Sequence, residues 1–332
     1  MEFNNYNSNY ANMNNGNANY QRQYPYNTNM NNGNANYQGQ YHSNANTNNG
    51  NANYQGQYPS NANMNNENAN FQGNMNNEID MPSAKLFNHY GKTDIGKVAK
   101  INEDYVDGFS LLNDSVMCLC ISDGLGSVQG GQFSSIVAIQ ELKDYLTNFL
   151  TNDTSDHIKF TLYNAMYLVN RIIYNYQRLN PELYGSFIST ITVAIINKNK
   201  EMVIGHVGNT RAYIIRDNAI YQMTRDDTAA RDLVDSKELL EEEYPQHPDR
   251  NRLTKWLGAT KLDPYINVQK LERGDLILLT TNGVFEMISD ENIKNLILET
   301  GNSKKACETI VDISNEQGGV DNMGVMLSYI DF

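Results

Sequence analysis

The chain has 332 residues and a formal net charge of −13 at neutral pH, with 25 Lys and Arg against 38 Asp and Glu. This acidic balance argues against nucleic acid as a partner, because neutralising phosphates requires a basic face. No apolar stretch approaches the roughly 20 residues of a membrane-spanning helix, and the first residues lack the basic and apolar parts of a signal peptide. We therefore expect a cytoplasmic protein that binds neither nucleic acid nor membrane.

Residues 1–83 differ in composition from the rest of the chain. Asn dominates, with Tyr, Gln, Ala and Gly, and an aromatic residue recurs every 17 positions, at Tyr20, Tyr37, Tyr54 and Phe71. Few aliphatic side chains are available to offset an ordering entropy of roughly 1 to 2 kcal/mol per residue, so the composition predicts a disordered tail. Spaced aromatics among Asn and Gln are also typical of self-associating tracts, and a duplication without function is an equal alternative.

The remaining residues, 84–332, have the pattern of one folded domain. Residues 105–112 and 115–122 predict a hairpin. Apolar residues at helical spacing over 136–149 and 158–176 then predict two amphipathic helices, whose stripes we attribute to core packing.

Short strands and two further helices fill the second half of the domain. A meander is predicted from strands at 187–196, 202–207, 212–216 and 219–223. An acidic insertion over 232–243 predicts a surface flap. Later strands are predicted at 266–269, 276–281 and 323–330, and helices at 290–299 and 303–314. Strands clustered with helices outside them predict the α+β class, with two antiparallel sheets face to face and helices covering both.

The three cysteines are Cys118, Cys120 and Cys307. Their number is odd and their spacing matches no disulfide framework, so disulfides are not expected. We interpret Cys118 and Cys120 as small buried side chains on a strand, with a metal-binding pair as the alternative.

Two apolar strands end in similar tripeptides, Ser-Asp-Gly at 122–124 and Thr-Asn-Gly at 281–283. A buried strand fixes its last side chain at a sheet edge, and the following Gly lets the backbone turn there. A buried carboxylate is costly without compensation, so Asp123 requires a cation or strong hydrogen-bond donors. Mg²⁺ and Mn²⁺ prefer such oxygen ligands. Asn282 presents a neutral amide where Asp123 presents a charge.

Five motifs, in this order, resemble the PPM (PP2C-type) metal-dependent protein serine/threonine phosphatases of bacteria. They are Asn102-Glu103-Asp104, Asp123-Gly124, Gly208-Asn209-Thr210-Arg211-Ala212-Tyr213, Thr281-Asn282-Gly283 and Gly318-Gly319-Val320-Asp321-Asn322. The resemblance covers residues 91–329. It implies a four-layer α/β/β/α sandwich that hydrolyses phosphoserine and phosphothreonine with a water activated by two Mn²⁺ or Mg²⁺ ions.

The resemblance also implies roles for individual residues. Asp123 would bridge the two ions, Gly124 would supply a backbone carbonyl, and Asp321 would bind from the last strand. Glu103 and Asp104 would hold metal-bound waters. The predicted catalytic residues are Glu103, Asp104 and Asp123, and the predicted metal ligands are Asp123, Gly124, Asp321, Asn282 and Glu286.

The chain departs from the family pattern at three positions. Asn282 and Asn209 stand where family members carry Asp, and Ala99 stands where they carry a phosphate-binding Arg. Two unit charges 4 Å apart interact by about 4 kcal/mol at an effective dielectric near 20, so losing one predicts a weakened metal site. Asn209, with Glu286 as its acidic neighbour, matches a looser third ion site that is predicted to be lost. Loss of the guanidinium removes a bidentate phosphate clamp.

Two functions therefore stay open. One is a phosphatase of weakened activity that acts on phosphoprotein substrates. The other is a catalytically inactive pseudophosphatase that serves as a binding or regulatory module, with the Asn-rich tail for self-association. His206 is interpreted as a core or strand-end histidine and not as a general acid.

Overall fold

The computed structural model of the protein describes residues 12–21, 29–38, 46–49, 53–55, 78–80, 87–126, 130–180 and 187–331. The chain divides into two compact units. One consists of Met1–Asn74 with Asn175–Tyr184, and the larger one consists of Met75–Tyr174 with Gly185–Phe332. The domain boundary predicted between residues 83 and 84 stays a prediction. None of the helices in the described ranges is long and apolar enough to cross a membrane.

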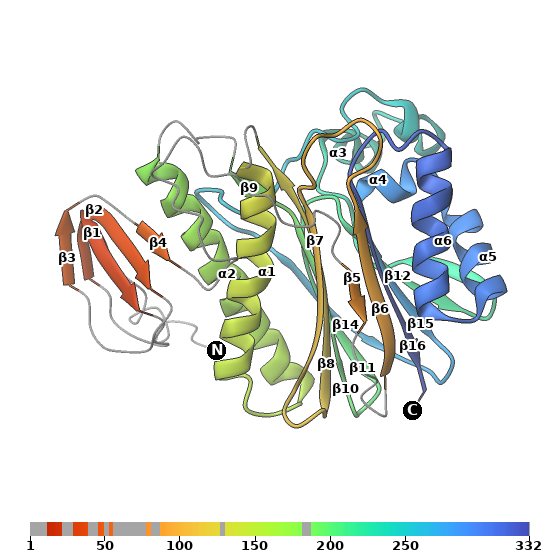
Figure 1. Ribbon diagram of the computed structural model, residues 1–332, viewed down its shortest axis with the longest axis horizontal. Coiled ribbons are helices and arrows are strands. Elements are labelled where there is room, and N and C mark those ends of the chain that lie inside the picture. The colour runs from red at the N-terminus through yellow and green to blue at the C-terminus, as the bar shows by residue number, and fades with distance from the viewer. Residues whose placement is uncertain are drawn as a thin grey trace. The chain divides into compact units, whose positions relative to one another are not determined.

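Four short strands lie in the Asn-rich tail (Figure 1). They are β1 (Asn12–Gln21), β2 (Asn29–Gln38), β3 (Asn46–Asn49) and β4 (Asn53–Gln55), and they pair in parallel. Successive copies of the repeat pair with one another, so repeated sequences satisfy one another's backbone groups. Apart from these strands and residues 78–80, the tail lies outside the described residues, and its disorder stays a prediction.

The first sheet of the domain has six strands in the order β14-β11-β10-β8-β7, with β9 beside β8. They are β7 (Asp104–Leu111), β8 (Val116–Leu125), β9 (Ile188–Ser189), β10 (Ile191–Asn197), β11 (Glu201–Val207) and β14 (Tyr265–Lys270). All pairings are antiparallel. The predicted hairpin is confirmed as β7 and β8, which are joined by a turn with positive φ at Leu112, Asn113 and Asp114.

The second sheet has the order β13-β12-β15-β16-β6-β5. Its strands are β5 (Glu78–Asp80), β6 (Phe87–Asp94), β12 (Arg211–Arg216), β13 (Ala219–Gln222), β15 (Leu276–Thr280) and β16 (Met323–Ile330), all paired antiparallel. Sequence patterns missed β5 and β6. Strand β6 mixes polar residues with Gly91 and owes its conformation to pairing with β16 along its whole length.

Helices cover the outer faces of both sheets (Figure 1). Helix α1 (Gly130–Phe149) packs on β7 and β8, followed along the chain by α2 (Ser155–Leu179), and α6 (Ser303–Glu316) packs on β6 and β16 beside α5 (Asp290–Thr300). All four confirm predicted helices. The predicted flap region contains two short helices, α3 (Ala229–Asp235) and the 3₁₀ helix η2 (Glu241–Gln246), and α4 (Asn282–Phe285) follows β15 directly.

The hydrophobic core lies between the two sheets. Val106, Leu119 and Ile204 of the first sheet pack in one cluster with Ile277 and Met326 of the second. A second cluster joins the outer face of the second sheet to the apolar stripes of α5 and α6. Two sheets packed face to face under helices on both sides confirm the predicted α+β four-layer sandwich.

Leu119 is fully buried in the inter-sheet core, whereas Leu298 on α5 is 42% exposed. We expect Leu119→Ala to lower the free energy of unfolding by about 2 to 5 kcal/mol, because it removes buried methyl groups and leaves a cavity. Leu298→Ala, the same chemical change at the surface, should stay within about 0.5 kcal/mol of the natural chain. Urea unfolding of the two variants compares these values, and equal losses would contradict the assignment of the core.

Candidate active site

Two carboxylates oppose each other where β7 begins and β8 nears its end. Asp104 and Asp123 are direct cross-strand partners in the antiparallel ladder. Asp104 is buried and Asp123 is partly buried. The same register that buries Leu119 and Ile121 in the core therefore brings two negative groups together at one edge of the sheet.

Neighbouring side chains fix Asp104 from both sides. Thr281 donates its hydroxyl hydrogen to Asp104 Oδ2 at 2.8 Å, and its Oγ1 accepts from the Gly324 amide at 2.7 Å. Asn102 Oδ1 accepts from the Asp104 backbone N–H at 3.1 Å. Residues from β7, the end of β15 and β16 thus converge on one carboxylate, and the two sheets are joined at this point.

Asp123 is positioned through its backbone. Its N–H donates to Thr190 Oγ1 at 3.0 Å, while its carbonyl accepts from the Thr190 N–H at 2.8 Å and from Ser189 Oγ at 2.9 Å. These contacts leave the Asp123 carboxylate facing Asp104. The neighbouring Gly124 lies against the first turn of α1. A Cβ at this position would come within 1.8 Å of the Gly131 carbonyl oxygen. No other residue fits here.

Glu103 lies beside the pair. Its backbone N–H donates to Asn322 Oδ1 at 2.8 Å, and Asn322 Nδ2 donates to the carbonyls of Ile95 and Ile101. The Glu103 side chain accepts a hydrogen bond from the backbone of Gly131 at the start of α1. Asn322 therefore holds the loop that carries Glu103 against the loop that carries the next acid, Asp321.

Asn282 contacts Asp321 directly. Its amide Nδ2 donates to Asp321 Oδ2 at 3.3 Å, and the other carboxylate oxygen accepts from the Asn322 backbone N–H at 2.8 Å. An Asp at position 282 would repel Asp321, whereas the amide supplies a hydrogen to it. The Asn282 amide is therefore the partner of the Asp321 carboxylate here, where the family resemblance predicted a cation.

The remaining predicted residues lie apart from the carboxylate pair or are already engaged. Glu286 accepts from Arg250 Nη2 at 3.1 Å and from Asn251 Nδ2 at 2.6 Å, so both its oxygens are held by the segment that follows η2. Asn209 is buried, and its Oδ1 has no hydrogen-bond partner among the described residues. Ala99 lies in a partly exposed loop.

Burial and mutual repulsion perturb the three clustered acids. Burial raises the pKa of Glu103 to about 7, with the charge of Asp321 adding to the effect. Burial first, and then the neighbouring Asp104 charge, raise the pKa of Asp123 well above its usual range. Burial likewise raises the pKa of Asp104, although the hydrogen bond from Thr281 opposes it. The cluster resists holding its full negative charge without added positive charge.

The donor set fits a hard divalent cation. In the described part of the chain, no three or more His, Cys, Asp or Glu side chains are grouped so that they could hold a metal ion by themselves. Carboxylate oxygens are nevertheless the ligands that Mg²⁺ and Mn²⁺ prefer. Among the described residues, no Lys, Arg or His forms an ion pair with Glu103, Asp104 or Asp123. A cation near this pair would supply the missing compensation.

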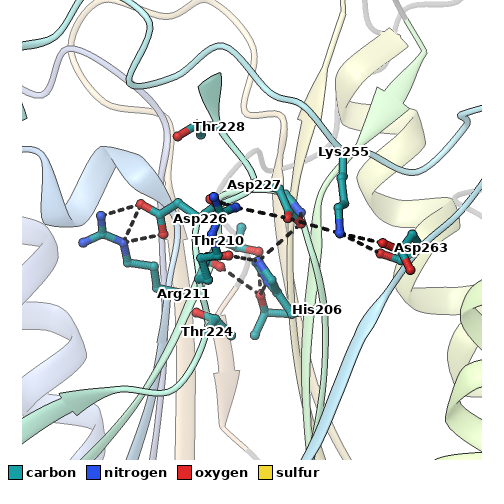
Figure 2. Close-up of polar contacts among 12 residues, drawn as sticks. His206, Thr210, Arg211, Thr224, Asp226, Asp227, Thr228, Lys255 and Asp263 are labelled. Carbon is teal, nitrogen blue, oxygen red and sulfur yellow. Dashed lines mark hydrogen bonds and ion pairs between the residues drawn. The ribbon is translucent and has the colours of Figure 1, made fainter. Parts of the chain in front are cut away.

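A second polar cluster, which sequence patterns did not single out, anchors the flap (Figure 2). Arg211 and Asp226 are buried and form a two-pronged pair, with Nε to Oδ1 at 2.9 Å and Nη2 to Oδ2 at 2.6 Å. Tyr244 of η2 donates its hydroxyl hydrogen to Asp226 Oδ2 at 2.6 Å. Burial alone would raise the pKa of Asp226, but Arg211 holds it below its usual value. The only sequence signal was that Arg211 falls in the third of the five motifs.

His206 lies next to this cluster (Figure 2). It is buried, with Nδ1 at 2.8 Å from Thr192 Oγ1 and Nε2 at 2.9 Å from the Arg225 carbonyl oxygen. Burial lowers the pKa of His206, and the nearby Asp227 opposes this. Both ring nitrogens have partners, which confirms its interpretation as a structural histidine.

The chain is similar to known bacterial phosphatases over most of its length. It is 28% identical over 236 residues to protein phosphatase PhpP of Streptococcus pneumoniae serotype 2, covering 71% of this chain and 94% of PhpP. It is 26% identical over 237 residues to serine/threonine phosphatase stp of Listeria welshimeri, covering 71% and 93%.

Solved structures agree with these sequence relatives. Serine/threonine phosphatase Stp1 from Staphylococcus aureus superposes with a TM-score of 0.69 at 26% identity, covering 76% of this chain and 98% of Stp1. The catalytic domain of the phosphatase PstP, solved in complex with 2 manganese ions, has the same fold with a TM-score of 0.64 at 22% identity, covering 74% of this chain and 99% of that domain. The protein phosphatase 2C family model matches residues 97–318. The chain therefore belongs to the protein phosphatase 2C family and carries a PPM-type serine/threonine phosphatase domain.

Proposed function

We propose that this domain hydrolyses phosphoserine and phosphothreonine in protein substrates with the help of Mn²⁺ or Mg²⁺, at a weakened rate. The observation that carries the proposal is the opposed pair of Asp104 and Asp123, which lacks an ion-pair partner among the described residues. Bound divalent ions would lower the pKa of water and neutralise charge on the phosphoryl group. A cytoplasmic location and self-association of the tail stay predictions.

Each residue of the site would have its own role in binding the ions and the water. Asp123 and Asp104 would hold a cation between the two sheets, with the Gly124 carbonyl as a further oxygen donor. Glu103 would orient water at the site, because Asn322 fixes its backbone and the Gly131 backbone fixes its side chain. Asp321 would bind a second ion from the last loop.

The second ion is where we expect the weakening. The Asn282 amide donates to Asp321 and so competes with a cation for the same carboxylate oxygen. Glu286 is engaged by Arg250 and Asn251, which leaves it a poor ligand. Complete loss of turnover would make the domain a pseudophosphatase, and the Asn282–Asp321 contact is the observation that favours this second candidate.

Asn282→Asp tests the second ion site. We expect Mn²⁺ to bind at least about tenfold more tightly by calorimetry, because a charge replaces the amide, and we expect faster hydrolysis of a phosphothreonine peptide. Asn302→Asp is the matched control, since Asn302 caps α6 and Asp caps helices equally well. An unchanged Mn²⁺ affinity, or a natural chain as fast as PhpP, would contradict the weakening.

Ala99→Arg tests the missing phosphate clamp. A guanidinium at this position should raise kcat/KM for the peptide by about 10-fold to 100-fold, since hydrogen bonds to charged groups contribute about 1.5 to 3 kcal/mol. Val98→Arg adds the same charge at the exposed neighbouring position and should change the rate far less. If both variants gain equally, general attraction of the phosphate is responsible and the clamp is refuted.

The stability of the metal-free protein should depend on Glu103. Its pKa of about 7 in the folded protein exceeds the unfolded value of about 4.3, so its contribution to stability is fully present below about pH 4.3 and is lost as pH rises through 7. The free energy of unfolding can be measured by urea in the presence of a chelator between pH 5 and 8. In Glu103→Gln, this free energy should no longer show the fall with rising pH that Glu103 causes. Glu316→Gln at an exposed position is the control and should keep it.

A further inference from the structure

Strands β1 and β2 have the same ten-residue sequence, Asn-Met-Asn-Asn-Gly-Asn-Ala-Asn-Tyr-Gln. They pair in parallel, and the register sets equivalent residues opposite each other, from Asn12 with Asn29 to Tyr20 with Tyr37. The offset along the chain is the 17-residue period of the repeat. A register shift interrupts the pairing between Met13 and Gly16, and the 17-residue offset returns from the pair of Gly16 with Gly33 onward.

The third repeat continues the same ladder. Strand β3 pairs with the first half of β2 from Asn29 with Asn46, and β4 pairs with the second half of β2, where Tyr37 lies opposite Tyr54. Both pairings are parallel. The β2–β4 pairs keep the 17-residue offset, and the β2–β3 pairs begin with it and slip by one residue after Met30. The tail therefore adds one repeat after another to a single parallel ladder.

This ladder has an edge at its first repeat. Among the described strands, β1 pairs along its length with β2, and its one further pairing is Asn15 with Asn48 of β3. Strand β2, by contrast, has β1 as a partner and also β3 and β4. An edge strand presents a row of backbone N–H and C=O groups that can accept another strand.

We propose that the tail is a self-assembly module in which repeats of a second copy of this chain continue the parallel ladder. The occupant of the edge is a second copy because the strand already seated on β2 is identical in sequence to β2 itself. Backbone groups cannot distinguish a repeat of the same chain from a repeat of another. Such a contact is head-to-tail, so each added copy presents a further edge to which the next copy can pair.

Charge permits this association. Strands β1, β2, β3 and β4 contain no Asp, Glu, Lys or Arg, although the whole chain has a net charge of −13. Stacked strands repeat every 4.7 to 4.8 Å or so, a spacing at which like charges would repel strongly. Neutral, Asn-rich strands avoid that repulsion, and in parallel in-register stacks Asn ladders and aromatic rows add stability.

The test uses the full-length protein with proline in the ladder. Asn17→Pro and Asn34→Pro each remove one backbone N–H donor, and the two positions lie opposite each other in β1 and β2. The natural chain should form larger species as concentration rises in sedimentation velocity, and those species should diffract at roughly 4.7 to 4.8 Å. The double variant should need at least a tenfold higher concentration to assemble.

His42→Pro is the matched control. Pro25 and Pro59 already occupy the equivalent position of two other repeats, one period before and one after. This variant should assemble like the natural chain, and all three proteins should unfold thermally at the same domain transition. A natural chain that stays monomeric, assemblies without the 4.7 to 4.8 Å spacing, or a double variant that assembles normally would each overturn the proposal. Peptide hydrolysis by the same samples reports separately on the phosphatase function.

Discussion

The opposed carboxylates of Asp104 and Asp123 are the constraint on which the site depends. The β7–β8 register that buries Leu119 and Ile121 also sets these two acids face to face, so the core cannot form without creating the repulsion. The hydrogen bond from the Thr281 hydroxyl to Asp104 relieves part of this repulsion. The protein thus uses core stability to hold together negative groups that would separate on their own, which is how a rigid sandwich can preorganise a cation site.

Two asparagines near Asp321 have different effects on the site. Asn322 makes three hydrogen bonds that join the loops carrying Glu103 and Asp321, and it is needed whether or not a cation is present. Asn282 stands beside it and gives its hydrogen to Asp321. One amide builds the site, while the other takes over part of what a cation would do there.

Sequence patterns predicted the sandwich because the buried strands and the amphipathic helices have clear periods. They missed β6, whose polar residues and Gly91 give no period and whose strand form comes from β16. They located Asp104, Asp123 and Asp321 through motifs, but not the Asn282–Asp321 contact or the Arg250–Glu286 ion pair. These two contacts join residues 39 and 36 positions apart in the sequence, and their geometry is set only after the sheets and the loops have packed.

The contacts around the acids indicate how negative charge is distributed over this site. Glu286 is compensated by Arg250 and Asn251 of the segment after η2. Asp321 accepts hydrogen bonds from the Asn282 side-chain amide and the Asn322 backbone amide. Each of these partners is a part of the protein and needs no ion. Asp104 and Asp123 have no basic partner among the described residues, so the demand for a cation is concentrated between them. The proposed weakening of the second ion site rests on this uneven distribution, while Arg211, Asp226 and Tyr244 hold the flap through contacts of their own.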